Sequence, residues 1–272
     1  MTELAEVRRL QLARLISTRG FIRVTEASAH FAVSHVTIRG DLTDLEGRGL
    51  VVRVHGGAMP ASAAQDAEQP LEASRDRDAA AKRAIGAAAA QLVSSGESVY
   101  IDAGSTALAL AKALVDRHEL HDLVVVTSSL STALALEDAI PRFTVIVTGG
   151  TLRPLQHSLV NPFAAPMLDA LTVDWAFIGC NGVDARAGVT NVNLPEAEIK
   201  TLVMRRSHRR VVIADASKIG VVELAVVTPL DSVETLVTTG GELAEIRAAG
   251  VEVIVAVGVA VSSTRVPTSQ VR

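Results

Sequence analysis

Residues 34–57, SHVTIRGDLTDLEGRGLVVRVHGG, read as an amphipathic helix followed by a short basic strand. The Ser34 side chain can accept hydrogen bonds from the backbone N–H groups of the first helical turn. Gly49 stands where such a helix should stop. Apolar residues recur at the spacing of one helical face, at Ile38, Leu42 and Leu45. The stretch therefore predicts a helix that packs along one face and exposes the other.

The exposed face of this helix carries polar side chains long enough to reach base edges in a major groove. Recognition helices contact bases mainly through their N-terminal residues. Residues 50–55 follow as a short basic strand that ends at Gly56-Gly57, which gives the outline of a winged helix-turn-helix with double-stranded DNA as its partner. The candidate DNA contacts are Ser34, His35, Thr37, Arg39, Arg53 and His55.

Two further helices are expected upstream. Apolar spacing predicts one around residues 7–15, and Thr25 can cap a second that runs to Phe31. Only a tight turn fits between Phe31 and Ser34, as a helix-turn-helix requires. The alternative is a small helical domain whose polar residues are only solvated, because short motif matches also arise by chance.

Residues 33–42, VSHVTIRGDL, together with Leu45-Glu46 and residues 53–58, RVHGGA, resemble the N-terminal domain of the DeoR family of bacterial transcriptional regulators. The family usually carries a second basic residue where this chain has Gly40. A glycine inside a helix costs about 0.8–1 kcal/mol relative to alanine. The resemblance thus implies that Arg39 reads DNA without its usual partner.

The composition is that of a globular protein with room for two domains. The chain has 272 residues, 49% of them hydrophobic and 21% charged. Its apolar runs fall short of the roughly 18 residues that span a bilayer, and its start does not read as a signal peptide, so we expect a cytoplasmic protein without a membrane partner. The single cysteine, Cys180, is expected in the core.

The net charge of −4 conceals an asymmetry. The first 57 residues hold 8 Arg and 6 Asp or Glu, or +2, which leaves 18 basic and 24 acidic residues, or −6, for the rest. A basic head on an acidic domain is typical of a DNA-binding protein with a separate regulatory domain. Because +2 is modest, we expect two heads to act together in a homo-oligomer, a dimer or tetramer.

The predicted domains are a winged helix-turn-helix at 1–58, a linker at 59–78, an α/β domain at 79–260 and a flexible tail at 261–272. The linker is rich in Ala, Ser, Pro and charge. Short β-branched runs then alternate with helical segments, which predicts a mainly parallel sheet covered on both faces.

Ligands of such sheets bind where strands end, and four predicted strands end in polar residues. A helix that begins at such an end offers backbone N–H groups to a phosphate. Simple capping of each helix is the alternative reading. The four polar strand ends are residues 102–106 (DAGST), 127–129 (TSS), 148–150 (TGG) and 215–218 (DASK).

These four segments resemble the sensor domain of the DeoR family, as do Tyr100-Ile101 before the first of them and residues 174–179, DWAFIG. That sensor domain is similar in fold to ribose-5-phosphate isomerase. Family members typically sense phosphorylated sugars. Ser128 stands where the family commonly has Asn, and Asn161 where it commonly has Gly. With the turn at 149–150 included, the predicted effector-binding residues are Asp102, Gly104, Ser105, Thr106, Ser128, Gly149, Gly150, Glu198, Lys200 and Lys218.

Three functions remain open at this point. The first is a repressor of a carbohydrate operon controlled by a phosphorylated sugar, with no catalytic residue, cofactor or metal. The second is a sugar-phosphate isomerase with an appended DNA-binding domain, since Asp102, Glu198 and Lys218 could move a proton. The third is an architectural DNA binder with a stabilising second domain.

Overall fold

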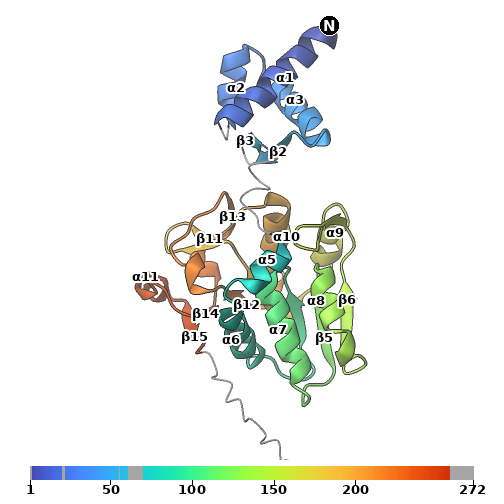
Figure 1. The fold of residues 1–272 in the computed structure, drawn as a ribbon, viewed down its shortest axis with the longest axis vertical. Coiled ribbons are helices and arrows are strands. Elements are labelled where there is room, and N and C mark those ends of the chain that lie inside the picture. Colours follow the sequence, from blue (N-terminus) through green and yellow to red (C-terminus); the bar gives the residue numbers. More distant parts are fainter. Residues whose placement is uncertain (1, 20–21, 55, 61–69, 258–272) are drawn as a thin grey trace, which may run out of the picture.

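The N-terminal domain is a helix-turn-helix followed by a β-hairpin (Figure 1). The computed structural model describes residues 2–19, 22–54, 56–60 and 70–257. The three strands of this domain form an antiparallel sheet in the order β1-β3-β2. Its elements are α1 (Thr2–Arg19), β1 (Ile22–Arg23), α2 (Val24–Phe31), α3 (His35–Gly47), β2 (Val51–Val54) and β3 (Gly57–Pro60).

The turn between α2 and α3 is as tight as predicted. Ala32 adopts the left-handed conformation with φ 50°, and its N–H donates to the Ser28 carbonyl. The start of α2 differs from the prediction, because Thr25 is not the N-cap. Arg23 holds that position, and its N–H donates to the Glu26 carboxylate at 3.1 Å, which starts the helix at Val24.

The small core of this domain joins all three helices to the sheet. The predicted stripe on α3 is buried against α1 and the strands. The buried apolar residues are Leu12, Ile16, Ile22, Val24, Ala27, Ile38, Leu42, Leu45, Val51 and Ala58. The face of α3 opposite this stripe is therefore left exposed.

The C-terminal domain is the predicted mainly parallel α/β fold. Its main sheet has seven strands, all paired in parallel, in the order β15-β14-β12-β9-β4-β5-β6. These strands are β4 (Ser98–Ile101), β5 (Leu123–Thr127), β6 (Phe143–Val147), β9 (Val173–Gly179), β12 (Ser207–Ile213), β14 (Thr235–Thr238) and β15 (Glu252–Val255).

α-Helices and short 3-10 helices, labelled η, precede or connect these strands. They are α5 (Leu71–Asp76), α6 (Ala79–Ala90), α7 (Ser105–Asp116), α8 (Leu130–Ala135), η1 (Glu137–Ala139), α9 (Ala164–Asp169), α10 (Leu194–Arg205), η2 (Ala216–Lys218), η3 (Leu230–Ser232) and α11 (Ala244–Ala248). Two small antiparallel additions were not predicted. They are the hairpin β7 (Thr151–Arg153) with β8 (Ser158–Val160), and the sheet of β10 (Gly182–Asp184), β11 (Gly188–Asn191) and β13 (Ala225–Thr228).

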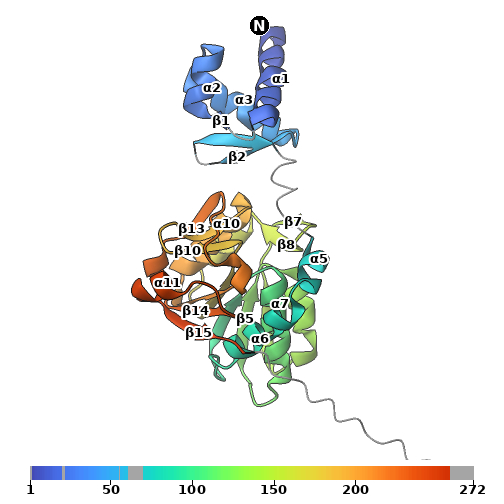
Figure 2. The same ribbon diagram turned by 60° about the vertical axis from the view of Figure 1, so that its left-hand side comes forward.

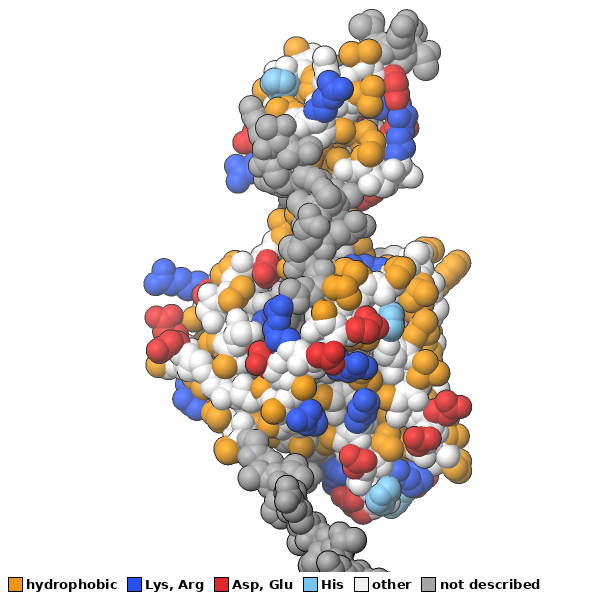
Figure 3. Space-filling model, in the orientation of Figure 1, with side chains coloured by type: hydrophobic (Ala, Val, Ile, Leu, Met, Phe, Trp, Pro, Cys, Tyr) orange, Lys and Arg blue, Asp and Glu red, His pale blue; other side chains and the backbone are white. Residues whose placement is uncertain are grey.

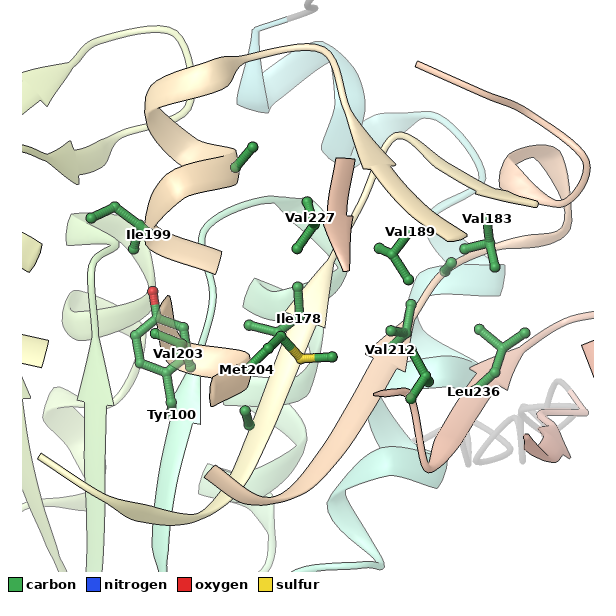
Figure 4. Close-up of a cluster of buried hydrophobic side chains, with 14 of the residues drawn as sticks. Tyr100, Ile178, Val183, Val189, Ile199, Val203, Met204, Val212, Val227 and Leu236 are labelled. Carbon is green, nitrogen blue, oxygen red and sulfur yellow. The ribbon is translucent and has the colours of Figure 1, made fainter. Parts of the chain in front are cut away.

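Alternate residues of each central strand face opposite cores, as the period of two in a strand requires. On β9, Trp175 and Phe177 face α6 and α7, whereas Ile178 faces α10. Figure 4 shows the second of these cores, where Val203 and Met204 of α10 lie over the strands. The sheet is thus buried on both faces, which explains the continuous apolar runs of its sequence.

The segment predicted as a linker, 59–78, contains α5. Leu71 is buried, and its N–H donates to the Leu155 carbonyl in the β7–β8 turn at 2.8 Å. Figure 2 shows α5 beside this hairpin and close to α7. Residues 61–69 of the predicted linker and the predicted tail, 261–272, lie outside the described residues. Among the helices that the structure describes, none is long and apolar enough to cross a membrane.

Candidate functional site

The first turn of α3 is fixed by its own side chains. The Ser34 hydroxyl accepts from the Thr37 N–H at 3.1 Å and lies 2.9 Å from the Thr37 hydroxyl. His35 and Arg39 are exposed beside this turn. Ser34 and Thr37 therefore hold the helix start, while His35 and Arg39 are presented to solvent.

Three arginines of the head are held by carboxylates of α1 and α3. Arg8 and Arg9 of α1 donate to Asp41 at 2.6 and 3.1 Å, and Asp41 is only 2% exposed. Arg48 pairs with Glu6 and Asp44 in the same way. Arg39 makes no ion pair with any residue that the structure describes, so its charge is available to a partner. Asp41 was missed in the sequence because a carboxylate inside a helix usually faces solvent.

Arg53 of β2 leans toward α3. Its Nη1 donates to the Thr43 hydroxyl at 2.7 Å and lies 3.8 Å from the Glu46 carboxylate. The Arg53 side chain is still 41% exposed. His55, the last predicted DNA contact, lies outside the described residues.

In the C-terminal domain, a polar cavity of about 110 Å³ lies where β4, β9 and β12 end. The N-terminus of α7 opens into it. Gly104 is the N-cap with φ 115°, and no side chain caps the helix. The cavity lining is Ser74, Arg77, Lys82, Ala103, Gly104, Ser105, Thr106, Ala107, Gln156, Gly179, Cys180, Asn181, Asn191, Glu196, Lys200, Ile213, Ala214, Asp215, Ser217 and Lys218.

Cations outnumber carboxylates in this lining, with four Lys or Arg against two Asp or Glu. Lys218 makes no ion pair within the described part of the chain. Burial lowers the pKa of Lys82, an effect that Asp215, at 3.9 Å, only partly offsets. Together with the uncapped N–H groups of α7, these charges make the cavity suited to an anion.

A buried ion pair forms the floor of the cavity. The Lys200 ammonium lies 3.2 Å from Asp102 and donates to the Gly179 carbonyl and the Asn191 amide oxygen at 2.9 and 3.0 Å. Although burial favours the neutral amine, Asp102 and Glu196 raise the pKa of Lys200 and keep it charged. Asp102 accepts a further bond from the Gly179 N–H at 2.9 Å.

The structure brings some of the predicted effector residues together and separates others. Gly104, Ser105, Thr106, Lys200 and Lys218 line the cavity, with Asp102 directly behind Lys200. The remaining four do not line it, namely Ser128, Gly149, Gly150 and Glu198.

Each of these four has a different setting. Ser128 is buried against the Tyr100 hydroxyl at 2.8 Å, and Glu198 is exposed and accepts from the Asn161 amide. Gly149 and Gly150 form the turn into β7. A Cβ on Gly150 would lie 1.9 Å from the Val160 carbonyl oxygen, so the turn itself requires this glycine.

Several lining residues were missed in the sequence. Glu196 of α10 lines the cavity where Glu198 was expected, and it accepts from Arg153 and Ser158. The sequence could have predicted Glu196, because Glu196 and Lys200 are four residues apart and therefore share one face of a helix. Arg77 and Lys82 carried no such signal, since they lie in the predicted linker and on an alanine-rich helix.

The arrangement favours binding over proton transfer. Asp102 pairs with Lys200, Glu196 with Arg153, and Asp215 accepts from Ser217 at 3.0 Å. Cys180 was predicted to lie in the core, but it is only partly buried and lines the cavity. Its surroundings still raise the pKa of the thiol to about 12 by desolvation, so Cys180 stays a thiol at neutral pH. The acidic side chains of the site are thus committed to holding other groups.

Charges of both signs are interspersed over the face of the C-terminal domain that carries α5, α6 and α7 (Figure 3). No single-sign field covers this view, in contrast to the surface that a DNA backbone needs. The α3 surface of the head remains the candidate for reading DNA.

Comparisons with known proteins agree for both domains. The DeoR C terminal sensor domain model matches residues 77–240, and the DeoR-like helix-turn-helix domain model matches residues 8–63. The HTH-type transcriptional regulator GolR of Listeria innocua is 34% identical over 234 residues, which cover 85% of this chain and 89% of the relative.

Two other relatives extend the comparison. The HTH-type transcriptional regulator GlpR of Haloferax volcanii is 32% identical over 251 residues, 91% of this chain and 96% of the relative. The lactose phosphotransferase system repressor of Staphylococcus aureus is 31% identical over 211 residues, 77% of this chain and 82% of the relative.

Solved structures similar to this chain include ribose 5 phosphate isomerase A from Neisseria gonorrhoeae, with 19% identity and a TM-score of 0.38 over 51% of this chain and 52% of the other. Another is the Pyrococcus horikoshii translation initiation factor eIF-2B, with 17% identity and a TM-score of 0.42 over 59% and 62%. The assignment therefore rests on the sequence matches: the chain belongs to the DeoR family of DNA-binding transcriptional regulators.

Proposed function

We propose that this regulator represses a sugar-related operon and responds to a phosphorylated sugar bound in the cavity of its C-terminal domain. The main observation in favour of a phosphorylated ligand is the N-terminus of α7, which no side chain caps and which faces a cavity lined by more cations than carboxylates. Backbone N–H groups and lysine ammonium groups are the donors that phosphate prefers. The names of two relatives, the lactose phosphotransferase system repressor and the putative aga operon transcriptional repressor, support repression.

The rest of the lining suits a sugar. Asn181, Asn191 and Gln156 offer amide groups, and Ser74 and Ser217 offer hydroxyls. Such groups donate and accept hydrogen bonds as sugar hydroxyls do. A phosphate at α7 and Lys218 would leave these groups for the carbon chain.

For the head, we propose that α3 enters the major groove, with Arg39 as its base-reading arginine. Arg39 is exposed and has no ion-pair partner among the described residues. Arg53, on the wing strand β2, donates a hydrogen bond to Thr43 of α3. Arg39 would read guanine, and Arg53 would contact phosphate. Two heads in a homo-oligomer would read paired half-sites.

The test combines operator selection with a ligand panel. Duplexes retained by the full-length protein from a randomised pool give the operator, and anisotropy then measures its release by pentose and hexose phosphates. We expect at least one phosphorylated sugar to change operator affinity and its unphosphorylated form to fail. No response to any member of the panel would contradict the proposal.

The same mixtures, followed by NMR, address the isomerase alternative. We expect the sugar phosphates to remain unchanged, since the carboxylates of the site are already paired. Steady conversion of one sugar phosphate into another would contradict this expectation.

A further inference from the structure

The exposed face of α3 carries an apolar side chain that no part of the described chain covers. Val36 and Gly40 are four apart and lie on the side of the helix opposite Ile38 and Leu42. Val36 is 76% exposed, whereas the other large apolar side chains described as exposed in the head, Val7, Leu10 and Leu50, are 47–51% exposed.

Gly40, next to Val36 on this face, has no structural role that demands a glycine. It lies inside α3 with an ordinary helical φ, and a Cβ built on it meets nothing within 4 Å. Gly86 in α6 is the contrasting case, because a Cβ there would lie 2.6 Å from the Ala109 backbone. The fold requires Gly86 but tolerates a larger residue at Gly40, although alanine would favour the helix.

The exposed Val36 side chain and the backbone at Gly40, which carries no side chain, form one apolar strip of α3, here called the Val36–Gly40 strip. Without a side chain at Gly40, a partner can approach the α3 backbone closely beside the Val36 methyl groups. Thr43 continues the same face, but its hydroxyl already donates to the Arg39 carbonyl and accepts from Arg53. Beside the Val36–Gly40 strip, the Thr43 hydroxyl thus already has partners, and Arg39 is exposed.

The major groove offers one apolar group that can pack on the Val36–Gly40 strip, the C5-methyl of thymine. We propose that Val36, beside the bare backbone at Gly40, packs on a thymine methyl adjacent to the base that Arg39 reads. The inference rests on the proposed insertion of α3 into the major groove, and it adds a determinant of operator sequence that is independent of charge.

The test removes the methyl from the DNA instead of the protein. In a duplex selected with the full-length protein, each thymine is replaced in turn by deoxyuracil, and binding is measured by anisotropy. We expect one thymine per half-site whose replacement weakens wild-type binding about fourfold, the worth of one buried methyl-sized group. Val36→Ala should bind more weakly to the thymine duplex and be insensitive to that same replacement.

Gly40→Ala supplies the second arm, with Gly47→Ala as its matched control. Both glycines lie on α3 with open space around a built Cβ, but Gly47 is at the far end of the helix from Val36. Both variants should unfold at the wild-type temperature or higher. Gly40→Ala should lose affinity for the selected duplex, whereas Gly47→Ala should keep it.

The outcomes separate this inference from the groove assignment. If Arg39→Ala loses discrimination between selected and scrambled duplexes while no thymine shows a methyl effect that Val36→Ala removes, α3 is in the groove and the proposed contact of Val36 with a thymine methyl is wrong. If Arg39→Ala and Val36→Ala both keep full discrimination, the groove assignment is wrong and the inference falls with it.

Discussion

Two strand ends of the C-terminal domain look alike in sequence and differ in structure. After β4 the chain reads Gly104-Ser105-Thr106, and after β5 it reads Ser128-Ser129, so each places hydroxyls at a helix start. At α8, the Ser129 hydroxyl accepts from the Thr132 N–H at 3.2 Å, and the helix is capped from within. At α7, no side chain caps the helix, and its N–H groups face the cavity. A capped helix start needs no ligand, whereas an uncapped one beside cations is ready for an anion.

The largest expected effect is on the free energy of unfolding, and it concerns a buried polar residue near the start of each helix. Asp102, near the start of α7, is buried and paired with Lys200, whereas the Ser128 side chain, near the start of α8, lies against the neutral Tyr100 hydroxyl. Lys200→Met should lower the free energy of unfolding by about 3–5 kcal/mol, because it leaves a buried carboxylate without its counter-charge. Ser128→Ala should cost only about 1 kcal/mol. Urea unfolding of both variants compares the two costs, and equal losses would mean that the ion pair does not hold the β4 end.

The second prediction concerns effector affinity. Lys218→Ala should weaken binding of the phosphorylated sugar about ten- to hundredfold, the loss of a charge-assisted contact of roughly 1.5–3 kcal/mol. Unfolding should be nearly unchanged, because Lys218 makes no ion pair with the described residues. Calorimetry measures the affinity, and Lys112→Ala, at an exposed cation outside the cavity, is the control. Equal affinities for both variants would remove Lys218 from the site.

The third prediction compares the serine at the start of α8, Ser129, with the serine at the start of α7, Ser105. Ser129→Ala should cost about 1 kcal/mol of stability by removing a cap, with effector affinity unchanged. Ser105→Ala should leave stability within about 0.5 kcal/mol of wild type but reduce effector affinity, because Ser105 lines the cavity. Thermal unfolding and calorimetry on both proteins check this crossed pattern. A loss of effector affinity in Ser129→Ala would show that the two ends are not separate.

The smallest expected effect is on pH dependence. The pKa of Lys82 is lowered by burial, so this ammonium loses its proton below the ordinary lysine value of about 10.4. Phosphate binding favours the protonated form, and effector affinity should fall as the pH rises through that lowered pKa. Lys82→Met should bind more weakly at neutral pH and lose this part of the pH dependence. Calorimetry at several pH values measures both, and an unchanged pH profile in Lys82→Met would contradict the assignment.

The sequence predicted the layers of the fold better than the composition of the site. The β-branched runs located the main strands, since a doubly covered sheet needs them. They did not give the order of the strands. The order places β4 and β12 on either side of β9, so the ends at 102–106 and 215–218 meet, while β5 and β6 end nearer the edge. That order explains why Ser128 and Gly149 lie outside the cavity.

Other residues were missed for local reasons. Glu198 was chosen over Glu196 although the spacing to Lys200 favours Glu196. Leu71 lies in a segment, 59–78, that composition marks as a linker, and its burial under the β7–β8 turn depends on contacts distant in sequence. In the head, the spacing predicted the apolar stripe on α3, Ile38, Leu42 and Leu45, but not the buried Asp41 beside it.

The most direct test of the account joins the cavity to the operator. Full-length wild type, Lys218→Ala and Ser129→Ala are each bound to the selected operator, and the phosphorylated sugar is titrated while anisotropy reports the bound fraction. Because a ligand shifts DNA affinity only through differential binding to two states, loss of effector affinity must move the response. We predict equal operator affinity without sugar for all three proteins, and a response midpoint about ten- to hundredfold higher for Lys218→Ala alone. A wild-type midpoint for Lys218→Ala would contradict the claim that the anion at α7 controls this regulator.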